Sequence, residues 1–240
     1  MDLQGKTALV TGGAKRVGRA IVLGLAEAGC NLVLHYNTSL EEAAATAGEA
    51  RALGAEVVLV EADLGEDAAK AVAGAADLAP VQILINSAAV FPTDRLLDLS
   101  PDTFDQTLAV NLRAPILLTM AFARALPEDL EGAVVNLTDW RNHRPYGIHF
   151  SYTISKGGID TFTIAAAEAL APRIRVNALS LGAILPPVGR TSQYLKELAK
   201  EIPVAHVGGT EPVVEGVLFL LRNDFVTGEI VRIDGGAHLR

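Results

Sequence analysis

The chain contains a single cysteine, Cys30, among its 240 residues. One cysteine cannot form an internal disulfide, which excludes a disulfide-stapled secreted scaffold. We therefore expect a cytoplasmic location, with Cys30 as a small buried hydrophobe. Positive charge is also scarce, because 20 Lys and Arg stand against 28 Asp and Glu, for a formal net charge of −8. Such a chain lacks the clustered cations that bind phosphate backbones, which argues against a general nucleic-acid binder.

Long uncharged apolar runs are absent as well. None reaches about 18 residues, so we expect no membrane span. The first residues show no basic segment followed by a long apolar stretch, so we expect no signal peptide. Half of the residues are nevertheless hydrophobic, which is enough to bury a sizeable core and excludes a disordered chain. No change of composition marks a linker, so we expect a single domain over residues 1–240.

Short apolar runs alternate with longer Ala-rich segments along the whole chain. The predicted strands cover residues 7–10, 32–36, 57–60, 83–85, 133–137, 174–179 and 230–233. The predicted helices cover residues 17–28, 40–53, 67–78, 101–126 and 151–170. Strands that are apolar throughout are buried on both faces, which predicts a single doubly wound (Rossmann) α/β domain: a seven-stranded parallel sheet with helices on both faces. The irregular stretch 181–193 is either a lid over a site or an ordinary surface loop.

A glycine-rich turn over residues 11–18 separates the first predicted strand from the first helix. In doubly wound sheets this turn binds a nucleotide pyrophosphate, because glycines let the backbone approach the phosphates and the helix N-terminus offers free N–H groups. The residues expected to contact the cofactor here are Gly12, Lys15, Arg16, Val17 and Gly18. Arg16 replaces the middle glycine of the common fingerprint, and it is expected either to grip the pyrophosphate or to reach the substrate.

The end of the second predicted strand indicates which dinucleotide is bound. Residues 35–39 contain no Asp or Glu, whereas an acid at this place binds the ribose 2′-hydroxyl of NAD and repels the 2′-phosphate of NADP. The neutral donors Asn37, Thr38 and Ser39, together with the positive charge of Lys15, therefore favour NADP(H) as the cofactor.

A tyrosine and a lysine, Tyr152 and Lys156, lie four residues apart in the helix predicted after the fifth strand. This spacing places both side chains on one helix face. A lysine next to a phenol favours the phenolate and lowers the phenol pKa, so Tyr152 becomes a usable proton donor near neutral pH.

Taken together, these motifs resemble the short-chain dehydrogenase/reductase family over essentially the whole chain. Beside the glycine-rich turn, Tyr152 and Lys156, the matching pieces are Asp63-Leu64, Asn86-Ser87-Ala88-Ala89, Asn111, Arg175-Val176-Asn177, Thr227-Gly228 and Asp234-Gly235-Gly236. The resemblance implies an NAD(P)-dependent oxidoreductase, usually a homotetramer, that acts on a small molecule and partners neither nucleic acid nor membrane.

The resemblance also implies roles for single residues. Tyr152 donates the proton, Lys156 lowers its pKa and holds the nicotinamide ribose, and Asn111 supports a proton-relay water. Further cofactor contacts are implied for Asp63 and Leu64 at the adenine, Asn86 near the ribose, and Ser87, Ala88 and Gly182.

One departure from the family pattern concerns the substrate. Most members carry Ser thirteen positions before the tyrosine, whereas this chain carries Asp139. A carboxylate cannot donate a hydrogen bond to a carbonyl as a hydroxyl does, and it repels a developing alkoxide unless it is protonated. Asp139 instead suits a substrate that offers N–H donors or needs a proton on nitrogen.

Asp139 with Tyr152 and Lys156 resembles the pteridine reductase branch of the family, which includes dihydromonapterin reductases. Arg16 and His35-Tyr36 match that branch too, and Phe91 matches the aromatic residue that stacks on the pterin. The expected substrate contacts are therefore Arg16, Phe91 and Trp140. Two features depart from the branch: a basic residue near Thr38 is missing, and Leu181-Gly182 stands where a Pro-Gly is common.

Several alternatives remain open at this point. Thr138 could take the role of the serine, Phe91 could belong to the core, and Trp140 could merely pack its loop. The leading function is an NADPH-dependent reductase of a pterin-like C=N bond. The alternatives are a general carbonyl reductase, such as a 3-oxoacyl-thioester reductase, and a catalytically silent NADP-binding protein. The histidines show no metal-ligand spacing, so no metal is expected.

Overall fold

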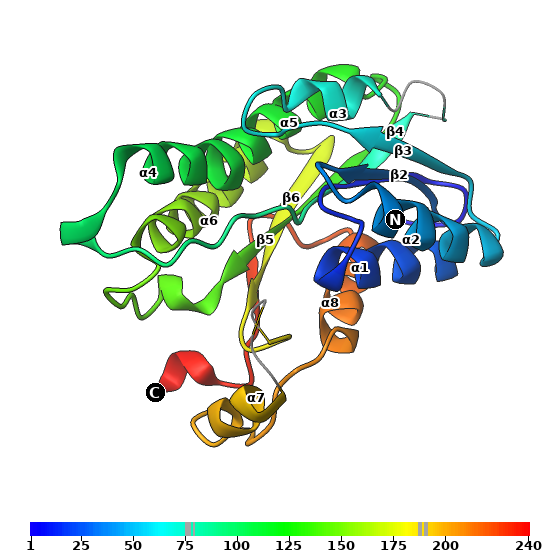
Figure 1. Cartoon of the computed structure of the whole chain (residues 1–240). Helices are drawn as coiled ribbons and strands as arrows, with labels where there is room; N and C mark the ends of the chain where they lie inside the picture. Colours follow the sequence, from blue (N-terminus) through cyan, green and yellow to red (C-terminus); the bar gives the residue numbers. More distant parts are fainter. Residues whose placement is uncertain (75–77, 79, 187–188, 190–191) are drawn as a thin grey trace.

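The predicted strands form one seven-stranded sheet, which runs through the middle of the computed structural model of the chain (Figure 1). The structure describes residues 1–74, 78, 80–186, 189 and 192–240. The strand order is β3-β2-β1-β4-β5-β6-β7, and all neighbouring strands are parallel. The strands are β1 (Thr7–Val10), β2 (Asn31–Tyr36), β3 (Val57–Glu61), β4 (Val81–Asn86), β5 (Gly132–Asp139), β6 (Ile174–Leu181) and β7 (Ile230–Ile233). The predicted fold class is confirmed.

Two apolar cores lie on the two faces of the sheet, because successive side chains of a strand point to opposite sides. On β1, Ala8 and Val10 belong to one core and Leu9 belongs to the other. Every residue of β1 and β5 is buried, as expected for strands covered on both faces. Cys30 is buried in the first core, where burial raises its pKa to about 11, in line with its prediction as a small hydrophobe.

The helices divide between the two faces (Figure 1). The first core is covered by α1 (Arg16–Glu27), α2 (Leu40–Ala52) and α8 (Glu211–Arg222). The second is covered by α3 (Ala69–Ala73), α5 (Ala114–Ala125) and α6 (Phe150–Leu170), with α4 (Pro101–Leu108) packed on α6. A short helix, α7 (Ser192–Ala199), lies apart from both layers beyond the carboxyl ends of β6 and β7.

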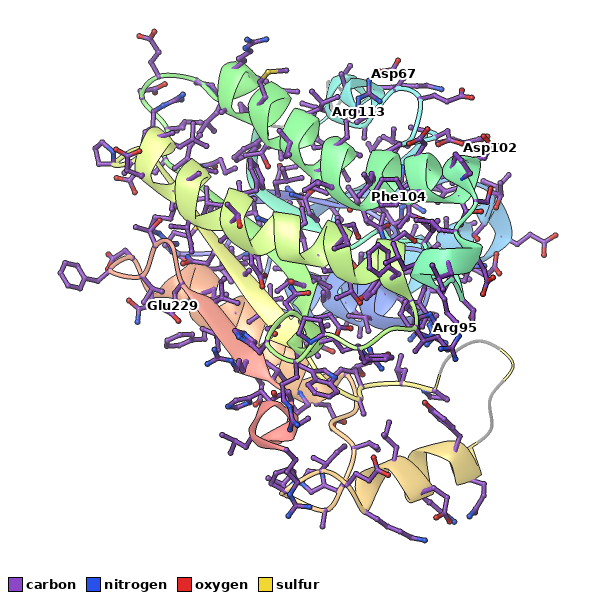
Figure 2. The ribbon with its side chains drawn as sticks, turned by 90° about the vertical axis from the view of Figure 1, so that its left-hand side faces the viewer. Asp67, Arg95, Asp102, Phe104, Arg113 and Glu229 are labelled. Carbon is purple, nitrogen blue, oxygen red and sulfur yellow. The ribbon has the colours of Figure 1, made fainter. Side chains whose placement is uncertain are left out.

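The long helix predicted over residues 101–126 is not a regular α-helix. Between α4 and α5 the chain forms a π-helical turn, η2 (Ala109–Arg113); Figure 2 shows its course, with Phe104 before the turn and Arg113 in it. Such turns often lie at functional sites. The turn here contains Asn111, whose side chain bonds the main chain of Val90, so a tertiary contact overrides the regular helix.

Within the described part of the chain, one helix is long and apolar enough to cross a membrane by length and composition alone, the continuous segment Pro101–Ala125. No membrane span is expected from the sequence. Core helices of soluble proteins pass the same test. Leu118 and Phe122 of this helix are buried in the second core, so the finding is weak evidence for a membrane span.

Other predicted elements also need correction. The helix predicted over residues 67–78 corresponds to α3, which begins at Ala69, where the Asp67 side chain accepts the Lys70 N–H; residues 75–77 of that prediction lie outside the described residues. The stretch predicted as irregular, 181–193, begins in β6 and ends in α7, and its residues 187–188 and 190–191 lie outside the described part.

Helix α8 was not predicted, although a signal was present. Pro212 lies in its first turn, and apolar residues follow at helical spacing and are buried in the first core: Val213, Val217, Leu220 and Leu221.

Candidate active site

The glycine-rich turn lies at the carboxyl edge of the sheet, next to the point where β1 and β4 are neighbours and the strand order reverses. Doubly wound sheets bind nucleotides at this point. The Thr11 hydroxyl oxygen accepts hydrogen bonds from the N–H groups of Ser87 (2.9 Å) and Ala88 (3.1 Å). These bonds hold the turn against the segment after β4, so two predicted cofactor motifs are adjacent in space.

Two glycines of the turn have no room for a side chain. Gly12 has a φ of +64°, and a Cβ there would lie 3.0 Å from the Cα of Ala88. A Cβ at Gly18 would collide with the carbonyl oxygen of Gly12. Helix α1 begins here without a side-chain cap and without an acidic residue in its first turn, so its positive end favours an anion. The turn therefore fits the pyrophosphate for which it was predicted.

His35 supports this turn from β2. The Gly12 N–H donates to Nδ1 of His35 at 3.1 Å, and Nε2 of His35 lies 3.0 Å from the carbonyl oxygen of Ala62. An acceptor at one nitrogen and a donor at the other describe a neutral imidazole, and burial lowers the pKa of His35. One N–H of the turn is therefore bonded to protein, a role that the sequence motif did not indicate.

The two cations of the turn also have protein partners. Nζ of Lys15 lies 3.0 Å from Oε1 of Glu42 on α2. Arg16 has a φ of +56°, a left-handed conformation that glycine adopts more readily, and its guanidinium donates to the carbonyl oxygen of Pro186 at 2.6 Å. Lys15 is thus not the free charge that the sequence suggested, and Arg16 reaches the segment after β6.

The predicted ribose and adenine contacts follow β2 and β3. Asn37 and Thr38 are exposed, and Ser39 is the N-terminal flanking residue of α2. Asp63 is exposed and accepts the Gly65 N–H at 2.8 Å. The Leu64 side chain is buried in the second core, which leaves its main chain for the implied contact with adenine.

The remaining predicted cofactor residues line the same edge of the sheet. Asn86 is buried at the end of β4 and donates to Oδ1 of Asn136 at 2.8 Å. Val17 packs on the first core. At Gly182, a Cβ would lie 2.6 Å from the Cα of Asp234, so only glycine allows this close approach of the chain after β6 to the end of β7.

Tyr152 and Asp139 meet at the carboxyl end of β5, where the Tyr152 hydroxyl donates to Oδ2 of Asp139 at 3.2 Å. Burial raises the pKa of Tyr152 well above its usual value, and the Asp139 carboxylate raises it further. The phenol therefore keeps its proton at neutral pH, as a proton donor must before it reacts.

Lys156 bonds the main chain and not the Tyr152 hydroxyl. Its buried Nζ donates to the carbonyl oxygen of Leu137 at 2.7 Å and lies 5.7 Å from the centroid of the Tyr152 ring. Burial lowers the pKa of Lys156 to about 8, although Asp139 and Asp160 favour its charged form. In this structure burial and the Asp139 carboxylate are the main influences on the pKa of Tyr152, and both raise it; that Lys156 lowers this pKa stays a prediction.

Asn111 is fully buried and fastens two segments of the site. Its Oδ1 accepts the Val90 N–H at 2.8 Å, and its Nδ2 donates to the Val90 carbonyl at 2.8 Å and to the Ser155 hydroxyl at 3.3 Å. The side chain thus joins the segment after β4 to α6. This task adds to the proton-relay role that the family resemblance implies.

Thr138, the alternative to Asp139, bonds other groups. Its buried hydroxyl donates to the Lys156 carbonyl at 3.3 Å and accepts from Nδ2 of Asn142 at 2.8 Å. Of the two neighbours, it is Asp139 whose side chain bonds the Tyr152 hydroxyl. The structure therefore favours Asp139 over Thr138 at the position of the family serine.

Phe91 is exposed rather than part of the core, with 41% of its surface accessible. Its ring stands edge-on to Tyr152, with ring centroids 4.6 Å apart, and stacks on His149 at 3.9 Å. Nδ1 of His149 lies 2.6 Å from the carbonyl oxygen of Pro92, which holds the Phe91 segment on the start of α6. An accessible aromatic ring therefore lies directly beside the candidate proton donor.

Arg141 was missed by the sequence analysis. Its backbone N–H and its guanidinium bond the two oxygens of Asp139, at 2.9 Å and 3.1 Å. The guanidinium carbon lies 5.1 to 5.9 Å from the ring centroids of Tyr146, Trp140 and Phe91. Trp140 therefore belongs with the polar centre of the site. We call these five residues (Phe91, Asp139, Trp140, Arg141 and Tyr146) the Arg141 cluster.

Comparison with known proteins agrees with this geometry. A family model described as enoyl-(acyl carrier protein) reductase matches residues 12–238. The chain belongs to the short-chain dehydrogenase/reductase family. It is therefore an oxidoreductase of the NAD(P)-dependent type, as the resemblance implied.

Relatives within the short-chain dehydrogenase/reductase family carry two kinds of name. The L-xylulose reductase of Bos taurus is 34% identical over 246 residues, which cover 98% of each chain. Two similar solved structures are those of FolM alternative dihydrofolate reductase 1 from Brucella canis and from Brucella suis, both in complex with NADP. Each has 36% sequence identity to this chain. They cover 100% of it and 97% of their own length, with TM-scores of 0.94 and 0.95.

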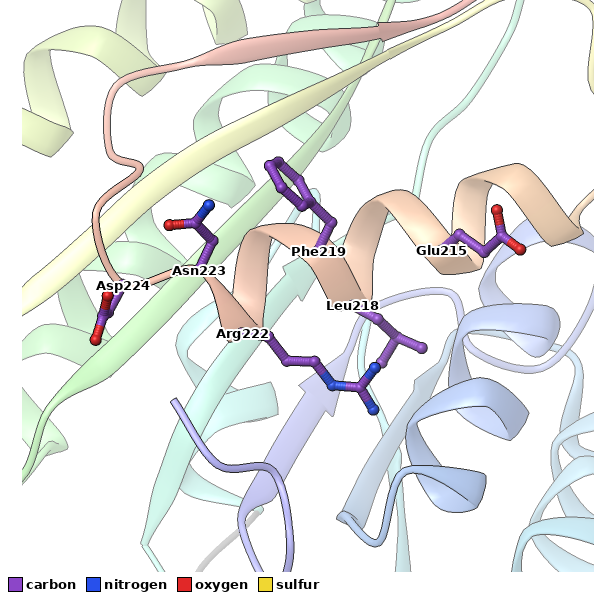
Figure 3. Close-up of a pocket in the computed structure, with 6 residues that line it drawn as sticks. All are labelled: Glu215, Leu218, Phe219, Arg222, Asn223 and Asp224. Atoms are coloured by element: carbon purple, nitrogen blue, oxygen red, sulfur yellow. The ribbon is translucent and has the colours of Figure 1, made fainter.

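A hollow of about 610 Å³ on the described surface of this short-chain reductase lies elsewhere (Figure 3). It is lined by Glu215, Leu218, Phe219, Arg222, Asn223 and Asp224. All six belong to α8 or directly follow it, and none belongs to the candidate active site.

Proposed function

We propose that this chain is an NADPH-dependent reductase of a pterin-like C=N bond in a dihydropterin or dihydrofolate. The observation that carries the proposal is the hydrogen bond between the Tyr152 hydroxyl and the Asp139 carboxylate. A carboxylate at this place accepts hydrogen bonds, so it suits a nitrogen heterocycle with N–H donors better than a carbonyl oxygen.

Reduction of C=N adds a hydride to carbon and a proton to nitrogen. The turn over residues 11–18 holds NADPH, which supplies the hydride when bound. Tyr152 is the proton donor of this proposal, because its hydroxyl carries a proton at neutral pH, although the raised pKa also makes the phenol a weaker acid. Asp139 holds the phenol in place and accepts hydrogen bonds from substrate N–H groups. Lys156 lies one helical turn further along α6 and holds the nicotinamide ribose, as the family resemblance implies.

The exposed ring of Phe91 supports a flat aromatic substrate. It stands edge-on to Tyr152 and stacks on His149, and a planar substrate would pack on the part of the ring that stays accessible. Aromatic stacking orients the substrate and contributes about 0.5–1.5 kcal/mol beyond the area that it buries. The two FolM relatives have dihydrofolate reductase in their names, in agreement with this substrate class.

A preference for NADPH over NADH follows from the end of β2. No acid stands among residues 35–39, and Thr38 is exposed where a 2′-phosphate would lie. We expect Thr38→Asp to shift the preference towards NADH by repelling that phosphate. Equal kcat/KM values for the two cofactors in the unmodified enzyme would contradict the preference.

Reduction of a ketone is the second candidate function. It is favoured by the L-xylulose reductase name of a relative that aligns along 98% of this chain. The Asp139 carboxylate counts against it, since a ketone oxygen becomes negatively charged during reduction.

The deciding experiment follows NADPH oxidation with dihydrobiopterin, dihydromonapterin, dihydrofolate, acetoacetyl thioester and L-xylulose in parallel. The proposal predicts that at least one dihydropterin or dihydrofolate is reduced with a kcat/KM at least about tenfold above that of either carbonyl compound. Turnover of the carbonyl compounds alone would establish the second function instead.

A homotetramer is the quaternary structure that this family membership favours. Apolar side chains are exposed on α5 and α6 (Ile116, Met120, Ile154 and Ile164) and again on and after α8 (Phe219 and Phe225). A tetramer with two kinds of two-fold interface needs two separate surfaces of this kind. Light scattering after size exclusion tests this directly, and a mass of one chain would contradict it.

A further inference from the structure

The Arg141 cluster contains an arginine that neither the family motifs nor the proposed mechanism uses. Arg141 binds both oxygens of Asp139, one through its backbone N–H and the other through its guanidinium. Tyr152 donates to the second of these oxygens. The carboxylate is thus held between two donors, and its orientation towards Tyr152 depends on Arg141.

The guanidinium is also packed among aromatic rings. Its carbon lies 5.1 Å from the centroid of Tyr146, 5.6 Å from Trp140 and 5.9 Å from Phe91. These are distances at which a cation is attracted by an aromatic face. Only 22% of the Arg141 side chain is exposed, so water screens these contacts less than it screens a surface pair.

The side chain holds this position at a cost. Among the described residues, Nε of Arg141 is buried and has no hydrogen-bond partner. A buried unpaired donor is unfavourable, and an arginine two residues after Asp139 could instead extend into solvent. The guanidinium nevertheless contacts both the Asp139 carboxylate and the three aromatic rings.

We propose that Arg141 is a positioning and specificity-determining residue of this reductase. It aims the Asp139 carboxylate at Tyr152 and balances its charge, and it joins Phe91, Trp140 and Tyr146 into one wall that receives a planar substrate. This inference deepens the proposed function, because it explains how a carboxylate is accommodated where a proton is transferred.

The charge balance has a direct consequence for Tyr152. When the phenol gives up its proton, the resulting phenolate lies next to a carboxylate, and two negative charges this close repel each other. The Arg141 guanidinium opposes that repulsion, since it lowers the pKa of Tyr152 while Asp139 raises it. Without Arg141 the proton is harder to transfer, whichever substrate accepts it.

The test uses Arg141→Met, which keeps the length of the side chain and removes its charge, and Arg141→Lys, which keeps the charge and removes the planar fork. Arg144→Met is the matched control, because Arg144 is an exposed arginine three residues along the same segment. We expect Arg141→Met to lower kcat at least about tenfold, Arg141→Lys to recover most of kcat with a raised KM, and Arg144→Met to change neither. Binding of NADPH should stay within about twofold in all three.

A double-mutant cycle separates positioning from a general structural effect. If Arg141 acts through Asp139, the effect of Arg141→Met shrinks when Asp139 is already Asn. An undiminished effect in that background, or an Arg141→Met variant that behaves like Arg144→Met, would overturn the inference. Circular dichroism shows whether Arg141→Met folds. If it does not, the test uses Arg141→Lys instead, and an unchanged KM and kcat in that variant would overturn the inference about Arg141.

Failure of the proposed function would be recognised separately. In that case the unmodified enzyme reduces a ketone and no dihydropterin, and the same cycle is measured with the ketone. Arg141 contacts Asp139, and Asp139 contacts Tyr152, independently of which substrate is bound, so the expected coupling between Arg141 and Asp139 remains.

Discussion

Two ion pairs lie at the carboxyl edge of the same sheet, one beside the cofactor turn and one in the Arg141 cluster. The side chains of Lys15 and Glu42 are 50% and 51% exposed, whereas those of Arg141 and Asp139 are 22% and 11% exposed. Lys15 and Glu42 have water as an alternative partner. Asp139 shares its oxygens with the Tyr152 hydroxyl and with two donors of Arg141.

The comparison teaches that the energetic effect of an ion pair depends on how far its two side chains are buried. Exposed pairs contribute little, because water and salt compete with them. A partly buried pair is strongly felt when one partner is removed, since the other charge stays behind without compensation. Substitutions around Tyr152 and Asp139 should therefore alter the chemistry, whereas substitutions around Lys15 should only adjust the choice of cofactor.

The largest expected effect is that of Tyr152→Phe. It removes the proton donor and keeps the ring against Phe91, so turnover should fall by about 10²–10⁴-fold while NADPH binding is retained. Turnover is followed by NADPH oxidation, and binding by the emission of Trp140, the single tryptophan. Tyr146→Phe is the control, because it removes a hydroxyl from the same cluster. More than about a tenth of the activity left in Tyr152→Phe would assign the acid to another group.

The second-largest effect concerns the carboxylate of Asp139, in the partly buried ion pair with Arg141. Asp139→Asn keeps the shape and removes the carboxylate, so kcat for a dihydropterin should fall at least about tenfold. Asp139→Ser should lose dihydropterin reduction and gain ketone reduction, because a neutral hydroxyl can donate to a carbonyl oxygen. If both variants reduced dihydropterins like the unmodified enzyme, Asp139 would be no more than a cap for the Arg141 main chain.

The third prediction uses the buried lysine. Burial disfavours the charged form of Lys156, so its proton is lost at about pH 8 instead of near pH 10.5. If activity requires the ammonium, kcat/KM, which reports the free enzyme, should be constant below about pH 8 and fall about tenfold per unit above it. Lys156→Arg should move this break to higher pH, because a guanidinium keeps its proton. A break that is unchanged in Lys156→Arg would belong to a different group.

The smallest expected effect concerns the exposed ion pair of Lys15 and Glu42. Glu42→Gln should free Lys15 for the 2′-phosphate and remove a nearby negative charge, so NADPH should bind about two- to fivefold more tightly and NADH should be unaffected. The gain should disappear at high salt. Glu49→Gln is the matched control, because Glu49 forms a comparable exposed pair between α1 and α2, with Arg19. Equal gains for both cofactors, or for both variants, would show that Glu42 does not act on cofactor choice.

Much of the fold could be predicted because its signals are local. Strands β1 and β7 agree with the predicted ranges at both ends. Helices α2 and α6 differ from theirs by one residue at one end, and α1 by one residue at each end. Apolar runs and helical spacing are properties of neighbouring residues. The π-helical turn was not predictable in this way, because Asn111 leaves the regular helix to bond Val90, which lies on another segment.

The candidate site also has features that could be predicted from the sequence and features that could not. The turn over residues 11–18 and the Tyr152–Lys156 spacing were recognisable, since each depends on residues close in sequence. The pairing of Lys15 with Glu42 and the bond from Lys156 to Leu137 were not. Both give a lysine a protein partner that the local sequence did not indicate, and both depend on which element packs alongside it.

The sequence by itself determined the doubly wound sheet, the nucleotide turn and the identity of the candidate acid, because hydrophobic period, glycine and residue type are local. Only the tertiary structure decided what surrounds that acid. Phe91 follows β4, Asp139 ends β5 and Tyr152 lies on α6, and they meet because parallel strands deliver their carboxyl ends to one edge. The distance between side chains so far apart in the chain is fixed by strand register and helix packing, which no local pattern encodes.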